Sequence, residues 1–334
     1  MPGISGLSRR RWGQSALFAI ATLLALAPSA VEAQTYPNRP IRLLHGFSAG
    51  GAADALARIV SDGLSKRLGQ PIVVEAKPGA GGNIAAVAVA NSAPDGYTLG
   101  LVTGAHAISG ALYKKLAYSP TDSFEMVSTL VYYALVIAVR ADYPAKDLPD
   151  LIAMAKQKPN ELSFGSVGFG STHHLAGELL NTTAGIKMVH VPYRGDAPSV
   201  TSLLGGDVPV VIGTTVLLAG QIESGAIRGL AVTSPARTAL LPNVPSAEEA
   251  GLRGYDVRTW AGLVVPKGTP ADIVSKLNTE VDAMLADPAV KKALETATGG
   301  EVRGSTPDEM RALICSEIAK WSKVIDEAQI ARID

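Results

Sequence analysis

The sequence contains a single cysteine, Cys315, among its 334 residues. One cysteine cannot form a disulfide within the chain, so packing must stabilise the fold. Cys315 lies in the apolar pattern of a helix near the end of the sequence, and we expect it to be buried as a small hydrophobic residue. No group of cysteines, histidines and carboxylates has the spacing of a metal centre, so we expect no metal and no cofactor.

The sequence also lacks an excess of charge of either sign, with 30 Lys and Arg residues against 30 Asp and Glu residues. Without residues 1–33, which hold three arginines and Glu32, the counts are 27 and 29, a net charge of −2. We therefore expect no nucleic-acid partner, because such proteins carry basic patches. The length, with 47% hydrophobic and 18% charged residues, is typical of a globular protein of two domains.

After residue 33 the sequence has no unbroken apolar run of about 18 residues, the length that suggests a membrane-spanning helix. Residues 1–33 are typical of an export signal, with three arginines, an apolar run at Ala16–Ala27 and small residues ending at Ala33. We expect cleavage after Ala33 and a periplasmic mature protein. The general secretory route and the twin-arginine route both stay open, because Ser8–Trp12 resembles a weak twin-arginine motif.

The stretch Tyr36–Val60 runs from a strand through a glycine turn into a helix. A short apolar run at Ile41–Leu44 is followed by three glycines and then by apolar residues at helical spacing. The first N–H groups of a helix have no partner within it and carry the positive end of the helix dipole. We therefore expect the region Phe47–Ala53 to hold the anionic group of a ligand.

Three more glycine-containing turns, Gly79–Asn83, Gly104–His106 and Gly165–His173, lie between a predicted strand and a predicted helix. Strands that alternate with helices predict parallel sheets with right-handed crossovers. Ligands of open α/β sheets bind beyond the carboxyl ends of the strands, so we expect the turns to line a common site. The predicted strands are 41–44, 72–75, 97–103, 134–139, 162–165, 188–191, 208–212 and 262–265, and the predicted helices are 52–68, 84–90, 148–155, 175–183, 197–204, 271–286 and 307–328.

The alternation of strands and helices starts afresh near residue 135 and returns near residue 261. This pattern predicts two α/β domains. We expect domain 1 to contain residues 34–134 and 262–334 and domain 2 to contain residues 135–261. Two adjacent crossings between domains make a hinge.

Short motifs spread along nearly the whole mature sequence are similar to those of one family. They are Tyr36-Pro37-Asn38-Arg39-Pro40-Ile41, Gly50-Gly51 with Asp54 and Ala57-Arg58, Pro78-Gly79-Ala80-Gly81-Gly82-Asn83, Asp95-Gly96-Tyr97-Thr98, His190-Val191-Pro192-Tyr193-Arg194-Gly195, Leu241-Pro242-Asn243-Val244-Pro245 and Glu249-Ala250-Gly251. In this order they resemble the Bug-type, TctC-like receptors of tripartite tricarboxylate transporters. The resemblance implies a type II periplasmic-binding-protein fold, a cleft between two domains that closes on a small carboxylate, and delivery to membrane permease subunits.

The residues expected to bind the ligand come from the turns of both domains. They are Phe47, Ser48, Gly50, Gly51, Ala53, Gly79, Ala80, Gly82, Asn83, Thr103, His106, Gly168, Gly170, Ser171, Thr172, His173, Tyr193, Asp196 and Thr214. We expect backbone N–H groups and hydroxyls to bind a small organic carboxylate, with di- and tricarboxylates, amino acids and aromatic acids all open. Arg194 and Asp196 are expected to act in closure.

Some of these residues have a structural alternative. Asn83 can cap its own helix, and His106 can face the cleft or act as a cap. His173 and His174 are adjacent, so on a helix they point about 100° apart and only one can face the cleft. Adjacent histidines are also poor joint ligands for zinc.

Gly46–Gly50 matches the G-x-S-x-G nucleophile elbow of serine esterases, with Ser48 as the nucleophile. In that fold several strands and the oxyanion loop precede the serine, whereas Ser48 follows the first strand of the mature chain. We therefore expect a receptor without catalytic residues and treat an exported esterase as the alternative.

Overall fold

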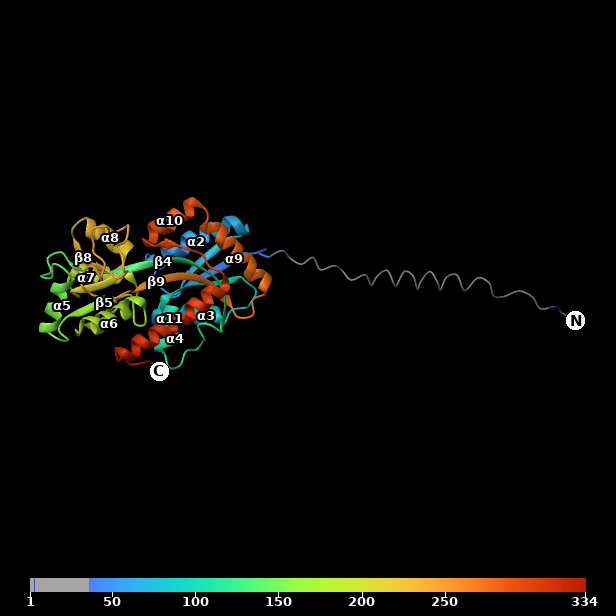
Figure 1. Cartoon of the computed structure of the whole chain (residues 1–334). Helices are drawn as coiled ribbons and strands as arrows, with labels where there is room; N and C mark the ends of the chain where they lie inside the picture. The colour runs from blue at the N-terminus through green and yellow to red at the C-terminus, as the bar shows by residue number, and fades with distance from the viewer. Residues whose placement is uncertain (1–2, 4–35) are drawn as a thin grey trace. The chain divides into compact units, whose positions relative to one another are not determined.

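The computed structural model describes residue 3 and residues 36–334 (Figure 1). The expected export signal, residues 1–33, lies outside the described residues apart from Gly3. Contacts divide the chain into Met1–Asn38 and Arg39–Asp334, and the second unit is the one described below. Within the described residues, no helix is both long enough and apolar enough to cross a membrane.

Three parallel strands open this unit, in the spatial order β2-β1-β3. The elements are β1 (Ile41–His45), α2 (Ala52–Leu68), β2 (Ile72–Ala76), α3 (Asn83–Ala90), β3 (Thr98–Thr103) and α4 (Gly104–Leu112). Helix α2 buries Leu56, Val60 and Leu64 because these residues recur every four positions on one helical face. It ends at Gly69, whose φ of 68° lies in the left-handed region that favours glycine.

The strand β4 (Phe124–Arg140) is 17 residues long and joins two groups of strands. Its first part pairs antiparallel with β9 (Arg258–Pro266), and its last part pairs antiparallel with β7 (Val210–Thr214) and β8 (Ile227–Val232). Figure 1 shows β4 and β9 running side by side. The sequence predicted only residues 134–139 of β4, because the strand is buried almost throughout and shows no alternation of apolar and polar residues.

A second α/β group surrounds the end of β4. It contains α5 (Leu148–Gln157), β5 (Ser163–Ser166), α6 (Thr172–Ala184), β6 (Val189–Pro192), α7 (Asp196–Gly205) and α8 (Thr215–Glu223), with β7 and β8. The strand β5 pairs in parallel with both β6 and β7, as the alternating pattern predicted. Helix α8 and strand β8 were missed by the sequence prediction.

We call the part around β1, β2, β3, β9 and the first part of β4 the first lobe. The part around β5, β6, β7, β8 and the rest of β4 is the second lobe. Together the strands form one ten-stranded sheet in the order β2-β1-β3-β9-β4-β7-β5-β6, with β8 and the short β10 (Glu301–Val302) paired to β4.

The last helices are α9 (Ala271–Leu285), α10 (Pro288–Thr298) and α11 (Pro307–Glu327). Helix α11 begins with a capping box in which the Thr306 side chain accepts from the Glu309 N–H and the Glu309 carboxylate accepts from the Thr306 N–H. The expectation that Cys315 is buried was wrong, because its side chain is exposed. Cys315 follows the buried Ile314 by one residue, a rotation of about 100° that turns it away from the buried face.

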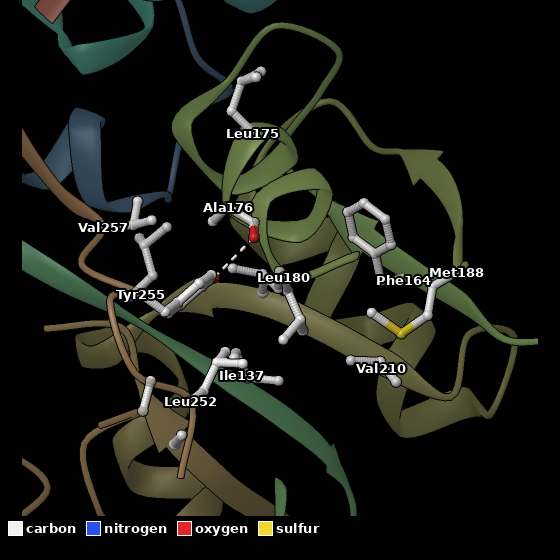
Figure 2. Packing of buried hydrophobic residues seen from close by; sticks show 14 of the residues in the cluster. Ile137, Phe164, Leu175, Ala176, Leu180, Met188, Val210, Leu252, Tyr255 and Val257 are labelled. Atoms are coloured by element: carbon white, nitrogen blue, oxygen red, sulfur yellow. Dashed lines mark hydrogen bonds between the residues drawn. The ribbon is translucent and has the colours of Figure 1, made fainter. Parts of the chain in front are cut away.

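An apolar cluster packs α6 against the end of β4, and Figure 2 shows the hydroxyl of Tyr255 in this cluster directed at Ala176. The Tyr255 hydroxyl donates a hydrogen bond of 2.8 Å to the Ala176 carbonyl oxygen of α6, and the ring is 1% exposed. Burial raises the pKa of the Tyr255 hydroxyl, so it stays protonated and serves as a donor.

Replacing Tyr255 by phenylalanine removes this buried hydrogen bond and keeps the ring. We expect the free energy of unfolding to fall by about 1 kcal/mol, the usual net contribution of one hydrogen bond. Urea unfolding of Tyr255→Phe and of Tyr143→Phe, whose hydroxyl is only half-buried, measures the difference. Equal losses in the two variants would contradict the assigned contribution of the Tyr255 hydroxyl.

Candidate functional site

Five helices begin around one cavity between the two lobes. Helices α2 and α4 belong to the first lobe and α6, α7 and α8 to the second. The cavity is narrow and partly open to solvent, with about 20 Å³ of space for the centre of a water molecule. It is lined by Phe47, Ala52, Ala53, Thr103, Ala105, Tyr133, Val167, Ser171, Thr172, His173, Asp196, Thr214 and Thr259.

Four of the five helix starts have no side-chain cap. The residues before α2, α4, α7 and α8 are Gly51, Thr103, Gly195 and Thr214, and none accepts a hydrogen bond from its own helix through a side chain. The N–H groups of a first turn have no partner inside the helix, so most of these donors remain for a ligand or for water. The start of α6 differs, because the Ser171 hydroxyl accepts from the His174 N–H at 3.2 Å.

The turn after β1 is fixed by contacts within the first lobe. A Cβ atom at Gly46 would collide with the Gly82 backbone, so only glycine fits there. The Asp54 carboxylate accepts from the Gly50 N–H at 3.1 Å and from Arg58 at 3.0 Å. Burial alone would raise the pKa of Asp54, but these hydrogen bonds outweigh it and lower the pKa. Asp54 therefore orders the turn and does not line the cavity.

His45, at the end of β1, lies directly behind this turn. Its Nε2 atom is 3.3 Å from Asp54 Oδ1, and the ring is fully buried. Burial lowers the pKa of His45 more than the neighbouring carboxylate raises it.

The hydroxyls on the second-lobe side are partly engaged by the protein. Ser171 Oγ donates to the Gly168 carbonyl oxygen at 2.7 Å. Thr172 Oγ1 lies 3.2 Å from Thr259 Oγ1 in β9. The free groups at this helix start are therefore chiefly the backbone N–H groups of Thr172 and His173.

The structure separates the two adjacent histidines. His173 lines the cavity, and its Nε2 atom lies 3.6 Å from Asp196 Oδ1. His174 points away, accepts from the Gly170 N–H through Nδ1 at 3.3 Å and stacks on His190 at a centroid distance of 4.0 Å. Burial lowers the pKa of His190 to about 3, with a further contribution from His174.

The second glycine turn lines two other hollows. Gly79 and Ala80 face a groove of about 1040 Å³ that also includes Gly168 and Tyr193. The Tyr193 hydroxyl is hydrogen-bonded to Ser202 within the second lobe. Arg194 lines this groove and not the cavity.

Gly82, Asn83 and His106 line a hollow of about 370 Å³ inside the first lobe. Asn83 does not cap α3, because Gly82 holds the N-cap position; its side-chain oxygen accepts from Ser109 and Tyr118 at 2.7 Å each. His106 lies in the first turn of α4 and is buried. Its Nε2 donates to the Pro120 carbonyl oxygen at 2.9 Å.

The remaining expected residues lie beside the cavity and do not line it. Ser48 lies against Gly195, where any Cβ atom would collide with the Ser48 hydroxyl. A Cβ atom at Gly51 would lie 3.7 Å from Asp196 Oδ2 in the other lobe. Gly50 and Gly170 have φ angles of 79° and 75°, so both shape their turns through glycine conformations.

Five residues that line the cavity were not named among the expected ligand-binding residues: Ala52, Ala105, Tyr133, Val167 and Thr259. Ala52, Ala105 and Val167 lie within the predicted turns, so only Tyr133 and Thr259 fall outside the segments expected at the site. Tyr133 and Thr259 face each other in the register of β4 and β9, a relation that requires the pairing of these strands to be known. Burial, with a smaller contribution from Asp196, raises the pKa of Tyr133.

The backbone at Ser48 does not have the geometry of a nucleophile elbow. The helix starts four residues later at Ala52, and the non-glycine residues with positive φ among those described are Ala80, Asn160 and Gln329. An elbow serine sits on a strained turn directly before its helix. Within residues 36–334, no histidine ring donates to or accepts from Ser48 Oγ.

A model of the family described as "Tripartite tricarboxylate transporter family receptor" matches residues 56–330. The chain belongs to this family. Solved structures of three similar proteins share its fold at TM-scores of 0.82 to 0.84, so the predicted two-domain periplasmic-binding-protein fold is confirmed.

The first of the three is the periplasmic binding protein BugD, 34% identical over 89% of this chain and 99% of BugD. The second is Rpa4515 of R. palustris with adipate, 37% identical over 89% of this chain and 99% of its own. The third is MatC from Rhodopseudomonas palustris with bound malate, 33% identical over 87% of this chain and all of its own. The TM-scores are 0.84, 0.84 and 0.82 in that order.

The buried imidazole of His106 makes the stability of the first lobe depend on pH. Burial lowers the pKa of His106 to about 4 from its ordinary 6.5. The unfolded chain therefore binds a proton at a higher pH than the folded chain, and stability falls as the pH falls from about 6.5 to about 4.

The amide of His106→Gln can still donate to Pro120 but does not titrate. Between about pH 7 and pH 5 we expect the free energy of unfolding to fall by roughly 2 kcal/mol less in this variant than in the wild type. Urea unfolding at several pH values measures both slopes. Parallel slopes for the two proteins would show that His106 does not titrate on unfolding.

Proposed function

We propose that the protein is a periplasmic solute receptor that captures a small organic carboxylate in the cavity between its lobes and delivers it to a tripartite tricarboxylate-type membrane transporter. The observation that carries the proposal is the convergence of five helix starts from both lobes on one cavity, four of them without a side-chain cap. Such a group of N–H donors favours a negative group without a lysine or arginine. Adipate and malate in the two similar structures support a carboxylate ligand.

The domain boundaries follow from the strand pairing. We assign residues 34–134 and 262–334 to domain 1 and residues 135–261 to domain 2. In support, β4 changes partners from β9 to β7 near residue 135, and β9 pairs with β3 from Ala261 onward. Two adjacent extended segments form the hinge.

Capture is a shift of population between open and closed forms. The ligand touches both lobes only when they are closed, so its binding free energy stabilises the closed form. Two close approaches between the lobes support a closed form here. Gly195 lies against Ser48, and a Cβ atom at Gly81 would be 2.9 Å from the Phe169 carbonyl oxygen.

Export and delivery complete the proposal. Residues 1–33 act as a cleaved export signal, so the mature receptor works in the periplasm as a monomer. The membrane permease subunits then distinguish the closed, loaded receptor from the open, empty one. The family description supports these partners.

Binding is tested by a thermal-shift panel of di- and tricarboxylates, amino acids and aromatic acids on the mature protein. A ligand that binds only the folded state raises the melting temperature. At a ligand concentration of a hundred times Kd, the free energy of unfolding increases by about 2.7 kcal/mol. We expect at least one carboxylate, and no uncharged amide or sugar, to raise it.

The same samples test the esterase alternative. A fluorophosphonate probe labels an activated serine covalently, so we expect no label at Ser48 by intact mass. Labelling of Ser48, or a panel whose positive compounds contain no carboxylate, would overturn the receptor proposal.

Closure is tested by comparing two glycines with nearly equal backbone geometry. Gly81 and Gly69 have φ angles of 65° and 68°, so alanine is strained to a similar degree at both, by about 1 kcal/mol. The Cβ atom at Gly81 would press on Phe169 of the other lobe, whereas at Gly69 it would meet no atom within 4 Å. We expect Gly81→Ala to weaken ligand binding about tenfold and Gly69→Ala to leave it unchanged, as isothermal titration would measure.

The two variants should melt at similar temperatures without ligand, because the local strain is the same. Equal ligand affinity in both variants would mean that the contact between Gly81 and Phe169 is not part of the bound state.

A further inference from the structure

One carboxylate lies inside the cavity that the helix starts surround. Asp196, in the first turn of α7, lines the cavity and is 8% exposed. Its Oδ1 atom accepts from the Thr214 N–H at 3.4 Å and from the Thr214 hydroxyl at 3.3 Å. Both distances are longer than those of strong hydrogen bonds to a carboxylate, so the acceptor capacity of Asp196 is poorly used within the protein.

The only imidazole at the cavity wall does not complete the pairing of this carboxylate. His173 Nε2 lies 3.6 Å from Asp196 Oδ1, and it is buried without a hydrogen-bond partner. Among residues 36–334, those that line the cavity include no lysine and no arginine. A buried carboxylate and a buried imidazole nitrogen therefore both face the same space with unused hydrogen-bonding capacity.

The charge on Asp196 restricts what can occupy that space. Two carboxylates a few ångströms apart in a site shielded from water repel each other, whereas an ammonium group at that distance is attracted to the carboxylate. A hydroxyl can donate one hydrogen bond but leaves the charge uncompensated. An ammonium group supplies a positive charge and three donors, enough for both Asp196 oxygens and one further acceptor.

Two helix starts beside Asp196 supply hydrogen-bond donors. Ala52 and Ala53 at the start of α2 and Thr172 at the start of α6 carry no ionised side chain, and the first-turn N–H groups of these helices have no partner inside the helix. Asp196 is near both starts, because a Cβ atom at Gly51 would lie 3.7 Å from its Oδ2 atom and His173 Nε2 lies 3.6 Å from its Oδ1 atom. The wall therefore offers donors for a carboxylate beside Asp196, an acceptor for a cation.

We propose that Asp196 determines ligand specificity and receives the ammonium group of an amino-substituted organic acid, whose carboxylate binds the first-turn N–H groups of α2 and α6. The proposal rests on the receptor function above and names its substrate class. Acids that carry only carboxylates are rejected by repulsion from Asp196.

The test uses pairs of acids that share a skeleton and differ by one amino group: aspartate and succinate, glutamate and glutarate, phenylalanine and 3-phenylpropanoate. Isothermal titration of the mature wild-type protein should give at least one pair in which the amino acid binds about tenfold or more tightly than its partner. In Asp196→Asn we expect that preference to shrink by about tenfold to several hundredfold, because removing one member of a buried charge pair is costly. We expect Asp196→Ser to reduce the preference for the amino acid as well.

Asp142→Asn is the matched control, since Asp142 is exposed and pairs with Arg140 away from the cavity. It should keep the wild-type preference. Melting temperatures without ligand verify that each variant folds. If only one Asp196 variant folds, that variant is compared with the wild type and with Asp142→Asn.

The outcomes separate the two proposals. A wild-type protein that binds the unsubstituted acids as tightly as the amino acids, or Asp196 variants that keep the amino preference, would overturn the role of Asp196 and leave the carboxylate receptor intact. A protein that binds no acid of the pairs or of the wider panel would overturn the receptor function itself.

Discussion

The site depends on one property of helices: the N–H groups of the first turn have no partner inside the helix. In this protein, five helix starts meet at a single cavity, and only one of them carries a side-chain cap. The donors are part of the backbone, so they need no charged side chain and lose no side-chain entropy when they bind. The fold supplies this arrangement because strands of both lobes end at the cavity and each is followed directly by a helix.

The continuous strand β4 makes the arrangement possible. Its first part belongs to the first lobe and its last part to the second, and β9 lies beside the first part. Tyr133 and Thr259, which lie opposite each other in these two strands, form the floor of the cavity at the point where the lobes meet. A rotation of one lobe against the other thus acts directly on residues that line the cavity.

Much of the first lobe could be predicted from the sequence. The strand at 41–44, the helix up to Leu68 and the glycine end at Gly69 agree with the structure to within one residue, because glycine conformation and apolar spacing are local signals. The expectation that the turns gather at one edge of the sheet followed from parallel topology, and both the cavity and the neighbouring hollows include residues of these turns.

What the sequence could not give depends on tertiary contacts. The first part of β4 is buried on both faces, so its pattern does not alternate. Asparagine often caps a helix, but the side-chain oxygen of Asn83 instead accepts hydrogen bonds from Ser109 and Tyr118, which lie far along the chain. The choice of His173 over His174 for the cavity depends on the rotation of α6, and His190, the stacking partner of His174, is identified only in the folded chain.

The five helix starts lie on five separate crossovers, so the site is modular. A substitution at one start, such as the residue at position 196, alters one wall while the other four keep their backbone donors and the sheet keeps its packing. After gene duplication, a single substitution at one helix start could change the ligand specificity of one copy while the fold stays the same. This architecture offers a low barrier to the evolution of uptake systems for many different acids.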